Sequence, residues 1–114
     1  MIILCCLFLL VLVGCDKFEK DLKSAKKGNA AAQFNVAVSY LEAKGVSLNT
    51  KKGIEWLKKS AEQGYAKGQA LLGLCYYWGK GVPKNNLKAL EWLKKSANQG
   101  NATGKKAYEK LRNQ

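Results

Sequence analysis

Residues 30–65 and 66–101 of this sequence are copies of one another, related by an offset of 36 residues. Of the 36 aligned positions, 17 carry the same residue in both copies. The densest agreement is a run that reads Glu-Trp-Leu-Lys-Lys-Ser-Ala from Glu55 and again from Glu91. A period of this length is typical of stacked helix pairs, because a single pair cannot bury its own apolar face without neighbours. The repeat therefore predicts a helical solenoid.

Each copy is expected to form two helices. The first, over 30–43 and 66–78, places small or apolar residues on one face at intervals of three and four positions. The second is expected to follow a capping asparagine, Asn49 or Asn85, and to end at a glycine. The sequence thus alternates helices that face the core with short polar connections.

Partial copies flank the two complete ones, since residues 17–27 read as a stray second helix and residues 103–112 as a stray first helix. The predicted fold class is therefore all-α, an αα-solenoid of two full repeats with a half-repeat at each end. In chain order we expect a short helical linker or half-repeat over 16–29, repeats at 30–65 and 66–101, and a capping helix over 102–114.

The second copy resembles a Sel1-like repeat, a unit related to the tetratricopeptide repeat (TPR). The resemblance is carried by the run Ala-Lys-Gly-Gln-Ala-Leu-Leu-Gly from Ala66, the turn Gly-Lys-Gly-Val-Pro from Gly79, and Trp92. The first copy resembles the unit more loosely, with Ala37 and Ala43 where the family prefers glycine. The resemblance implies a TPR-like superhelix that binds other proteins and has no catalytic residues or cofactor common to the family.

One branch of that family carries paired cysteines within its repeats and has been linked to β-lactam binding or hydrolysis. Here Cys75 stands opposite Ser39 in the other copy, so the cysteine pairs of that branch are missing. The resemblance therefore favours the binding role over the enzymatic one.

The start of the chain resembles a bacterial lipoprotein signal. Residues 2–13 are all apolar, too few to span a bilayer but suited to an export signal. They end in Leu12-Val13-Gly14-Cys15, which resembles a lipobox. We expect residues 1–15 to form the signal, with Cys15 lipidated and the protein facing the periplasm from a membrane of the bacterial cell envelope. Because no Lys or Arg precedes the apolar run, an uncleaved N-terminal anchor remains the alternative.

The charge of the chain points to the kind of partner. Twenty Lys and Arg residues against eight Asp and Glu give a net charge of +12, and Arg112 is the single arginine. Proteins that read nucleic acid usually employ arginine for bidentate contacts, so we expect no nucleic-acid partner. The lysines predict a solvated surface, an acidic protein partner or an anionic lipid surface.

The sequence is poorly equipped for catalysis. It has no histidine, which removes the commonest general base and metal ligand. Glu55 and Glu91 recur at the repeat period, each with a lysine four residues later, and are expected to form helix ion pairs. Trp56 and Trp92 recur too and are expected to pack between helices. We expect a protein that is not an enzyme and that needs no metal or cofactor.

The positions at which the copies differ predict the binding surface. Four of these positions form one stripe on the first helices, about 120° from the packed face at positions 30, 34, 37 and 41. The stripe consists of the aligned pairs Ala31/Lys67, Asn35/Leu71, Ser39/Cys75 and Glu42/Trp78. First helices line the concave surface of such arrays, so the predicted partner-binding residues are Lys67, Leu71, Cys75, Trp78, Asn35 and Glu42. The alternative is that Leu71 and Trp78 pack against the terminal helix.

Together these features predict a membrane-anchored adaptor or inhibitor that holds a protein, in one version an immunity-type lipoprotein that neutralises an acidic toxin. The alternative is an envelope enzyme or binder that acts on β-lactams or cell-wall fragments.

Overall fold

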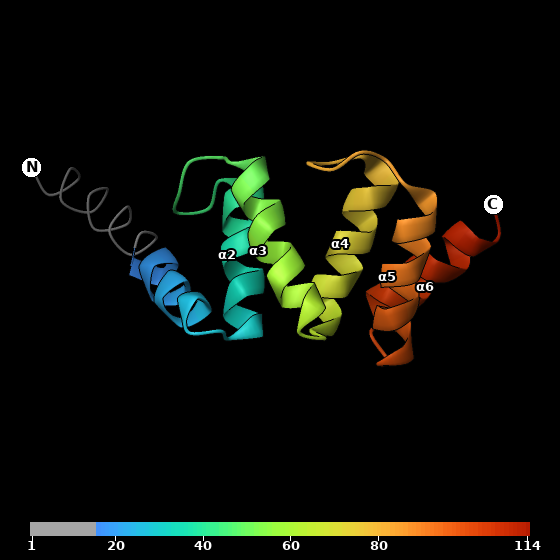
Figure 1. The fold of residues 1–114 in the computed structure, drawn as a ribbon, viewed down its shortest axis with the longest axis horizontal. Coiled ribbons are helices and arrows are strands. Elements are labelled where there is room, and N and C mark those ends of the chain that lie inside the picture. The colour runs from blue at the N-terminus through green and yellow to red at the C-terminus, as the bar shows by residue number, and fades with distance from the viewer. Residues whose placement is uncertain (1–15) are drawn as a thin grey trace, which may run out of the picture.

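The computed structural model describes residues 16–114, and the predicted lipoprotein signal with Cys15 lies outside them. The described part is all-helical and forms an elongated array 57 Å long and 27 by 23 Å across (Figure 1). Residues 16–26 form a first helix. The helices that follow are α2 (Ala30–Glu42), α3 (Thr50–Glu62), α4 (Ala66–Trp78), α5 (Asn86–Asn98) and α6 (Ala102–Arg112). The predicted αα-solenoid with terminal half-repeats is confirmed.

Asparagine side chains set the starts of most of these helices. Asn49 accepts a hydrogen bond from the Lys52 amide at 3.0 Å, and Asn85 accepts one from Lys88 at the same distance. Asn29 and Asn101 cap α2 and α6 in the same way. Each cap satisfies an amide that has no partner inside its helix. The predicted caps are thus confirmed, and two more are found.

The first helix of each repeat ends in a left-handed residue. In α4 this residue is Gly79, with φ of 68°, where glycine has no side chain to strain. In α2 it is Ala43, with φ of 55°, the one residue other than glycine with positive φ between residues 16 and 114. The chain therefore turns identically in both repeats, although only the second has the residue that suits the turn.

Two buried clusters hold the array together. The larger joins both repeats to α6 through residues such as Leu57, Leu72 and Leu93, which are at most 1% exposed. The smaller packs Phe18 and Ala25 of the helix over 16–26 against α2. The terminal half-repeats therefore contribute to the core, as such arrays require.

A repeated set of buried hydrogen bonds explains why the copies share polar residues. Ser60 donates to the carbonyl oxygen of Ala30 at 2.8 Å, and Ser96 makes the equivalent bond to Ala66 at 2.8 Å. A glutamine pair repeats as well, with the Gln99 side chain donating at 2.8 Å to that of Gln69, as Gln63 does to Gln33 at 2.7 Å. Buried polar groups must be paired, so these identities are fixed by the stacking.

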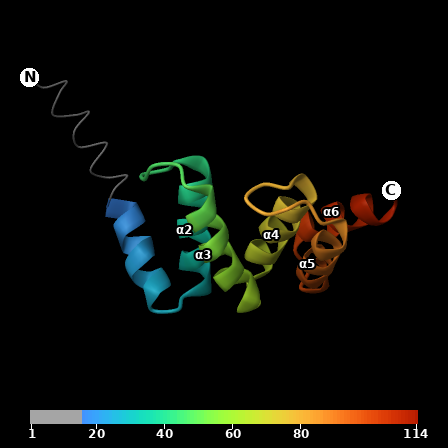
Figure 2. The same ribbon diagram turned by 45° about the horizontal axis from the view of Figure 1, so that its top comes forward.

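The connections lie on two opposite edges of the array. Loops 43–49 and 79–85 share one edge, and the short turns at 27–29, 63–65 and 99–101 share the other (Figures 1 and 2). We call them the loop edge and the turn edge. Among the described helices, none is long and apolar enough to cross a membrane.

Candidate functional site

The first helices of the two repeats enclose a groove of about 420 Å³. Its apolar part comes from Phe34 and Val38 on α2 and from Leu71 and Leu74 on α4. The start of α6 closes one end. We call this surface the groove, and its full lining is Phe34, Val38, Glu42, Lys44, Lys67, Ala70, Leu71, Leu74, Asn101 and Thr103. The predicted binding residues Lys67, Leu71 and Glu42 therefore lie together here.

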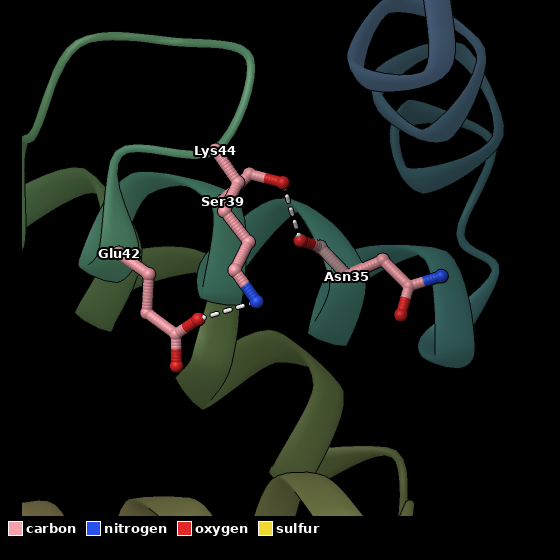
Figure 3. A network of polar contacts seen from close by, with 4 residues as sticks. All are labelled: Asn35, Ser39, Glu42 and Lys44. Carbon is pink, nitrogen blue, oxygen red and sulfur yellow. Dashed lines mark hydrogen bonds and ion pairs between the residues drawn. The ribbon is translucent and has the colours of Figure 1, made fainter. Parts of the chain in front are cut away.

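Charged groups stand at the rim of the groove. The ammonium of Lys44 lies 2.7 Å from the Glu42 carboxylate, both exposed (Figure 3). The hydrogen bond from Lys44, together with its charge, lowers the pKa of the Glu42 carboxyl. Lys67 is exposed on α4. Because Glu42 is already paired, Lys67 leaves the rim with a net positive charge.

Cys75 does not belong to this surface. Its side chain is fully buried in the larger cluster, which also contains Ile54 and Leu57 of α3. Burial raises the pKa of the Cys75 thiol, and the charge of Lys80 offsets this only in part. The prediction of Cys75 as a partner-binding residue is wrong, because α4 is covered by α3 on one side and α5 on the other.

Trp78 is exposed, at 59% of its surface. Its remaining surface lines a cavity of about 130 Å³, shared with Leu74, Tyr77 and Leu111. Leu74 also lines the groove, so the cavity and the groove adjoin at this side chain. Trp78 therefore borders a cavity that Leu111 of α6 also lines, while most of its side chain is open to solvent, and both expectations for it stay predictions.

Asn35 lies on the far side of α2 from Trp78. It is exposed and lines a cavity of about 330 Å³ with Lys17 and Phe18 of the helix over 16–26. Its backbone carbonyl accepts a hydrogen bond from the Ser39 hydroxyl at 3.0 Å (Figure 3). Phe34 lines both this cavity and the groove. Asn35 therefore lies next to the groove but is not part of its lining.

The pattern of differences between copies missed seven of the lining residues, among them the large apolar Phe34, Val38 and Leu74. Phe34 was assigned to the packed face, yet it is half-buried and lies edge-on to Tyr65, with ring centroids 5.6 Å apart. Position 38 and its equivalent 74 are apolar in both copies but fall outside the predicted packed face. That unexplained apolar position was the signal for the groove.

The second helices carry lysines above tryptophan rings. The ammonium of Lys59 lies 4.6 Å from the ring centre of Trp56, and that of Lys95 lies 4.5 Å from Trp92. Both rings are half-buried against the core, as expected. The expected ion pairs of Glu55 and Glu91 are wrong, since the one ion pair between residues 16 and 114 joins Glu42 and Lys44. The indole ring competes successfully for the lysine.

The residues that could support chemistry are dispersed. Over residues 16–114, no group of three or more Asp, Glu, Cys or His residues could hold a metal ion. The groove offers apolar side chains, one ammonium outside the ion pair, and the polar side chains of Asn101 and Thr103, which suit recognition of a chain segment.

The repeat model described as Sel1 repeat matches residues 30–65 and 66–101, the two ranges that the 36-residue offset defines. The chain belongs to the Sel1 repeat family. Sel1 repeat proteins generally act by binding other proteins. No curated protein matches this Sel1 repeat chain.

Solved structures share the same Sel1 fold. A protective antigen of uropathogenic Escherichia coli strains, described as displaying an SLR fold, is 35% identical over 84% of this chain and 21% of its own, with a TM-score of 0.80. A Sel1 repeat protein from Oxalobacter formigenes is 35% identical over 82% of this chain and 37% of its own, with a TM-score of 0.75.

A third structure shows likeness of fold alone. Cysteine-rich protein B of Helicobacter pylori is 23% identical over 76% of this chain and 65% of its own, with a TM-score of 0.72. This chain thus spans less than two thirds of the length of each of these three proteins.

Proposed function

We propose that the protein is a lipid-anchored, non-catalytic binding module of the bacterial envelope that holds an acidic protein segment in the groove. The observation that carries the proposal is the continuous apolar surface made by Phe34, Val38, Leu71 and Leu74 beneath the free ammonium of Lys67. In one version the bound protein is a toxin that the module neutralises.

The composition of the groove supports an extended or helical segment as its ligand. Its apolar part alternates between two helices and therefore offers successive sites for the side chains of one segment. Trp78, one helical turn beyond Leu74 at the end of α4, is a natural anchor beside the groove, because interface energy concentrates in aromatic residues. Lys67 would steer an acidic partner and affect the association rate more than the affinity.

The anchor is supported by the sequence that precedes the array. An uninterrupted apolar run ends at Leu12-Val13-Gly14-Cys15, and the first charge in the chain follows at Asp16. Acylation of Cys15 with two or more chains would give stable attachment, where a single chain would be marginal. Mass spectrometry of the N-terminal peptide tests this part; an intact Met1 terminus contradicts it.

Site-specific crosslinking tests the groove. A photoreactive phenylalanine analogue replaces Leu71 in the groove in one protein, and Lys59 on the second helices in a control. Incubated with envelope extracts, the first protein is expected to capture a partner that the control does not. Equal capture at both positions, or capture only at the control position, contradicts the proposal.

A further inference from the structure

The chain enters the array at the loop edge. The turn at 27–29 lies on the turn edge, so the helix over 16–26 begins toward the opposite edge (Figure 1). The repeat supports the same direction. Residue 16 aligns with Lys52 and Lys88, which lie in the first turns of α3 and α5 at the loop edge. Asp16, the residue that follows Cys15 in the sequence, therefore lies toward the edge formed by loops 43–49 and 79–85.

Positive charge is concentrated on the same edge. The loop edge comprises residues 16–18, 40–52, 76–88 and 110–114, and these carry nine Lys or Arg residues against two acids. The turn edge comprises residues 24–32, 60–68 and 96–104, and these carry three lysines against one acid. One of the two loop-edge acids, Glu42, is already paired with Lys44.

Aromatic rings beneath the loop edge hold some of its lysines in place. The ammonium of Lys88 lies 5.4 Å from the ring centre of Tyr76. The equivalent pair in the first repeat, Lys52 and Tyr40, is 5.8 Å apart. The repeat therefore places these two cations at equivalent positions, each above a tyrosine ring.

Large apolar side chains are exposed at this edge as well. Leu48 is 63% exposed in the loop after α2, and Leu87 is 74% exposed at the start of α5. The third exposed large apolar side chain in the described range is Trp78, at the loop-edge end of α4. The turn edge has none. Exposed leucines surrounded by lysines are the combination that peripheral proteins present to a bilayer interface.

We infer that the loop edge rests on the anionic surface of the bilayer that anchors the chain, with Leu48 and Leu87 reaching the headgroup boundary and the lysines facing lipid phosphates. The inference rests on the proposed membrane attachment and adds an orientation to it. The turn edge would then point away from the membrane, and the groove would stand beside the bilayer, open to a partner from the side. Attraction of the lysines to anionic lipid falls off within about 10 Å at 0.1 M salt, so contact must be close.

Lysine footprinting on the full chain tests this orientation. The protein is reconstituted in neutral phosphatidylcholine vesicles and in vesicles with 30% phosphatidylglycerol, and amine acetylation rates are read by mass spectrometry. We expect Lys80, Lys84 and Lys88 to react at least fivefold more slowly in the anionic vesicles, and high salt to reverse the effect. The turn-edge residues Lys26 and Lys27 should react equally in both.

Variants separate apolar contact from charge. The double variant Leu48→Gln/Leu87→Gln changes only exposed side chains, so its fold is retained, and it is expected to lose most of the loop-edge protection. The matched control Lys26→Gln/Lys27→Gln on the turn edge should keep it.

Three results would overturn the inference. The first is a uniform acetylation rate at all lysines, and the second is protection of Lys58 and Lys94 on the second helices in place of the loop edge. The third is protection of the loop edge by soluble polyglutamate but not by vesicles. The last would assign the edge to an acidic protein. The mass of the N-terminal peptide tests the lipid anchor separately. A chain that is not acylated but shows selective protection of the loop edge still supports the inference.

Discussion

At the scale of single residues, the two repeats differ most instructively at the turn that ends the first helix. Ala43 adopts a left-handed conformation that costs an L-residue with a side chain about 1–2 kcal/mol, whereas Gly79 adopts it freely. The stacking of the repeats holds Ala43 in place. This position therefore stores strain that a single substitution can remove.

Ala43→Gly is expected to raise the free energy of unfolding by about 1 kcal/mol, because glycine relieves the strain despite its greater freedom in the unfolded chain. The reciprocal change, Gly79→Ala, is expected to lower it by about 1–2 kcal/mol. An alanine Cβ there would lie 3.3 Å from that of Lys84, which adds crowding. Denaturant unfolding of both variants and of wild type measures the effect. An Ala43→Gly variant no more stable than wild type would show that Ala43 is unstrained.

Cys75 is expected to be unreactive in the folded protein. Burial raises its thiol pKa and so reduces the thiolate that reacts with alkylating agents. Iodoacetamide at pH 8 should modify it only after denaturation, as judged by the mass of the peptide that contains it. Rapid modification of the native protein would show that α4 opens locally and would return Cys75 to the exposed surface.

At the scale of helices, each repeat pairs one glycine with one alanine where its two helices cross. The first repeat has Ala37 on α2 facing Gly53 on α3, and the second has Gly73 on α4 facing Ala89 on α5. A Cβ added at Gly73 would lie 2.8 Å from Leu93 and 3.1 Å from the Ala89 carbonyl. Close approach therefore needs a glycine on one helix of each pair.

Gly73→Ala is expected to destabilise the protein by about 1–3 kcal/mol through this overpacking. Adding Ala89→Gly reproduces the arrangement of the first repeat and should restore part of the loss, so the two effects should not be additive. Thermal unfolding of the two single variants and the double variant tests the coupling. Strict additivity would show that the two positions are independent.

The helices could be predicted from the sequence because their signals are local. Asn49 and Asn85 mark helix starts through bonds to residues three positions away, and Gly79 marks an end through its own backbone. The 36-residue period supplied the stacking. The end of α2 could be predicted although Ala43 replaces the glycine, because other residues of the first repeat match those of the second.

The site could be predicted only in part, because the two copies do not have the same neighbours. Ser39 lines a cavity beside Phe18, whereas Cys75 is enclosed by Ile54 and its cluster. A position at which the copies differ is therefore either exposed to solvent or packed against a different neighbour in each copy. The sequence alone does not distinguish these two cases. Trp78 shows the first case and Cys75 the second.

At the scale of the whole molecule, stability is shared along the array. One cluster runs through both repeats and α6, and the second helices are tied to it through Trp56 and Trp92. Loss of one large contact should therefore weaken every helix together, since the array is too short for its repeats to unfold independently.

Trp92→Ala is expected to lower the free energy of unfolding by about 2–3 kcal/mol, less than for a fully buried ring because Trp92 is only half-buried. Lys95→Ala, which removes the ammonium above the same ring, is the control and should cost about 0.5–1 kcal/mol. Melts followed by circular dichroism should stay cooperative for both. A Trp92 variant as stable as wild type would revive a ligand-stacking role for this ring.

The account depends most on the groove as the binding surface, and a pair of binding isotherms tests it directly. The protein captured by the crosslinker at Leu71 is titrated against wild type, Trp78→Ala and the control Lys59→Ala, each with a thermal melt. We predict that Trp78→Ala melts normally and binds about 30-fold more weakly, corresponding to about 2 kcal/mol. Lys59→Ala should bind normally and lose only the stability, about 0.5–1 kcal/mol, expected for an ammonium above a tryptophan ring. Normal binding by a normally folded Trp78→Ala would contradict the groove, and unfolding of that variant would assign Trp78 to the core.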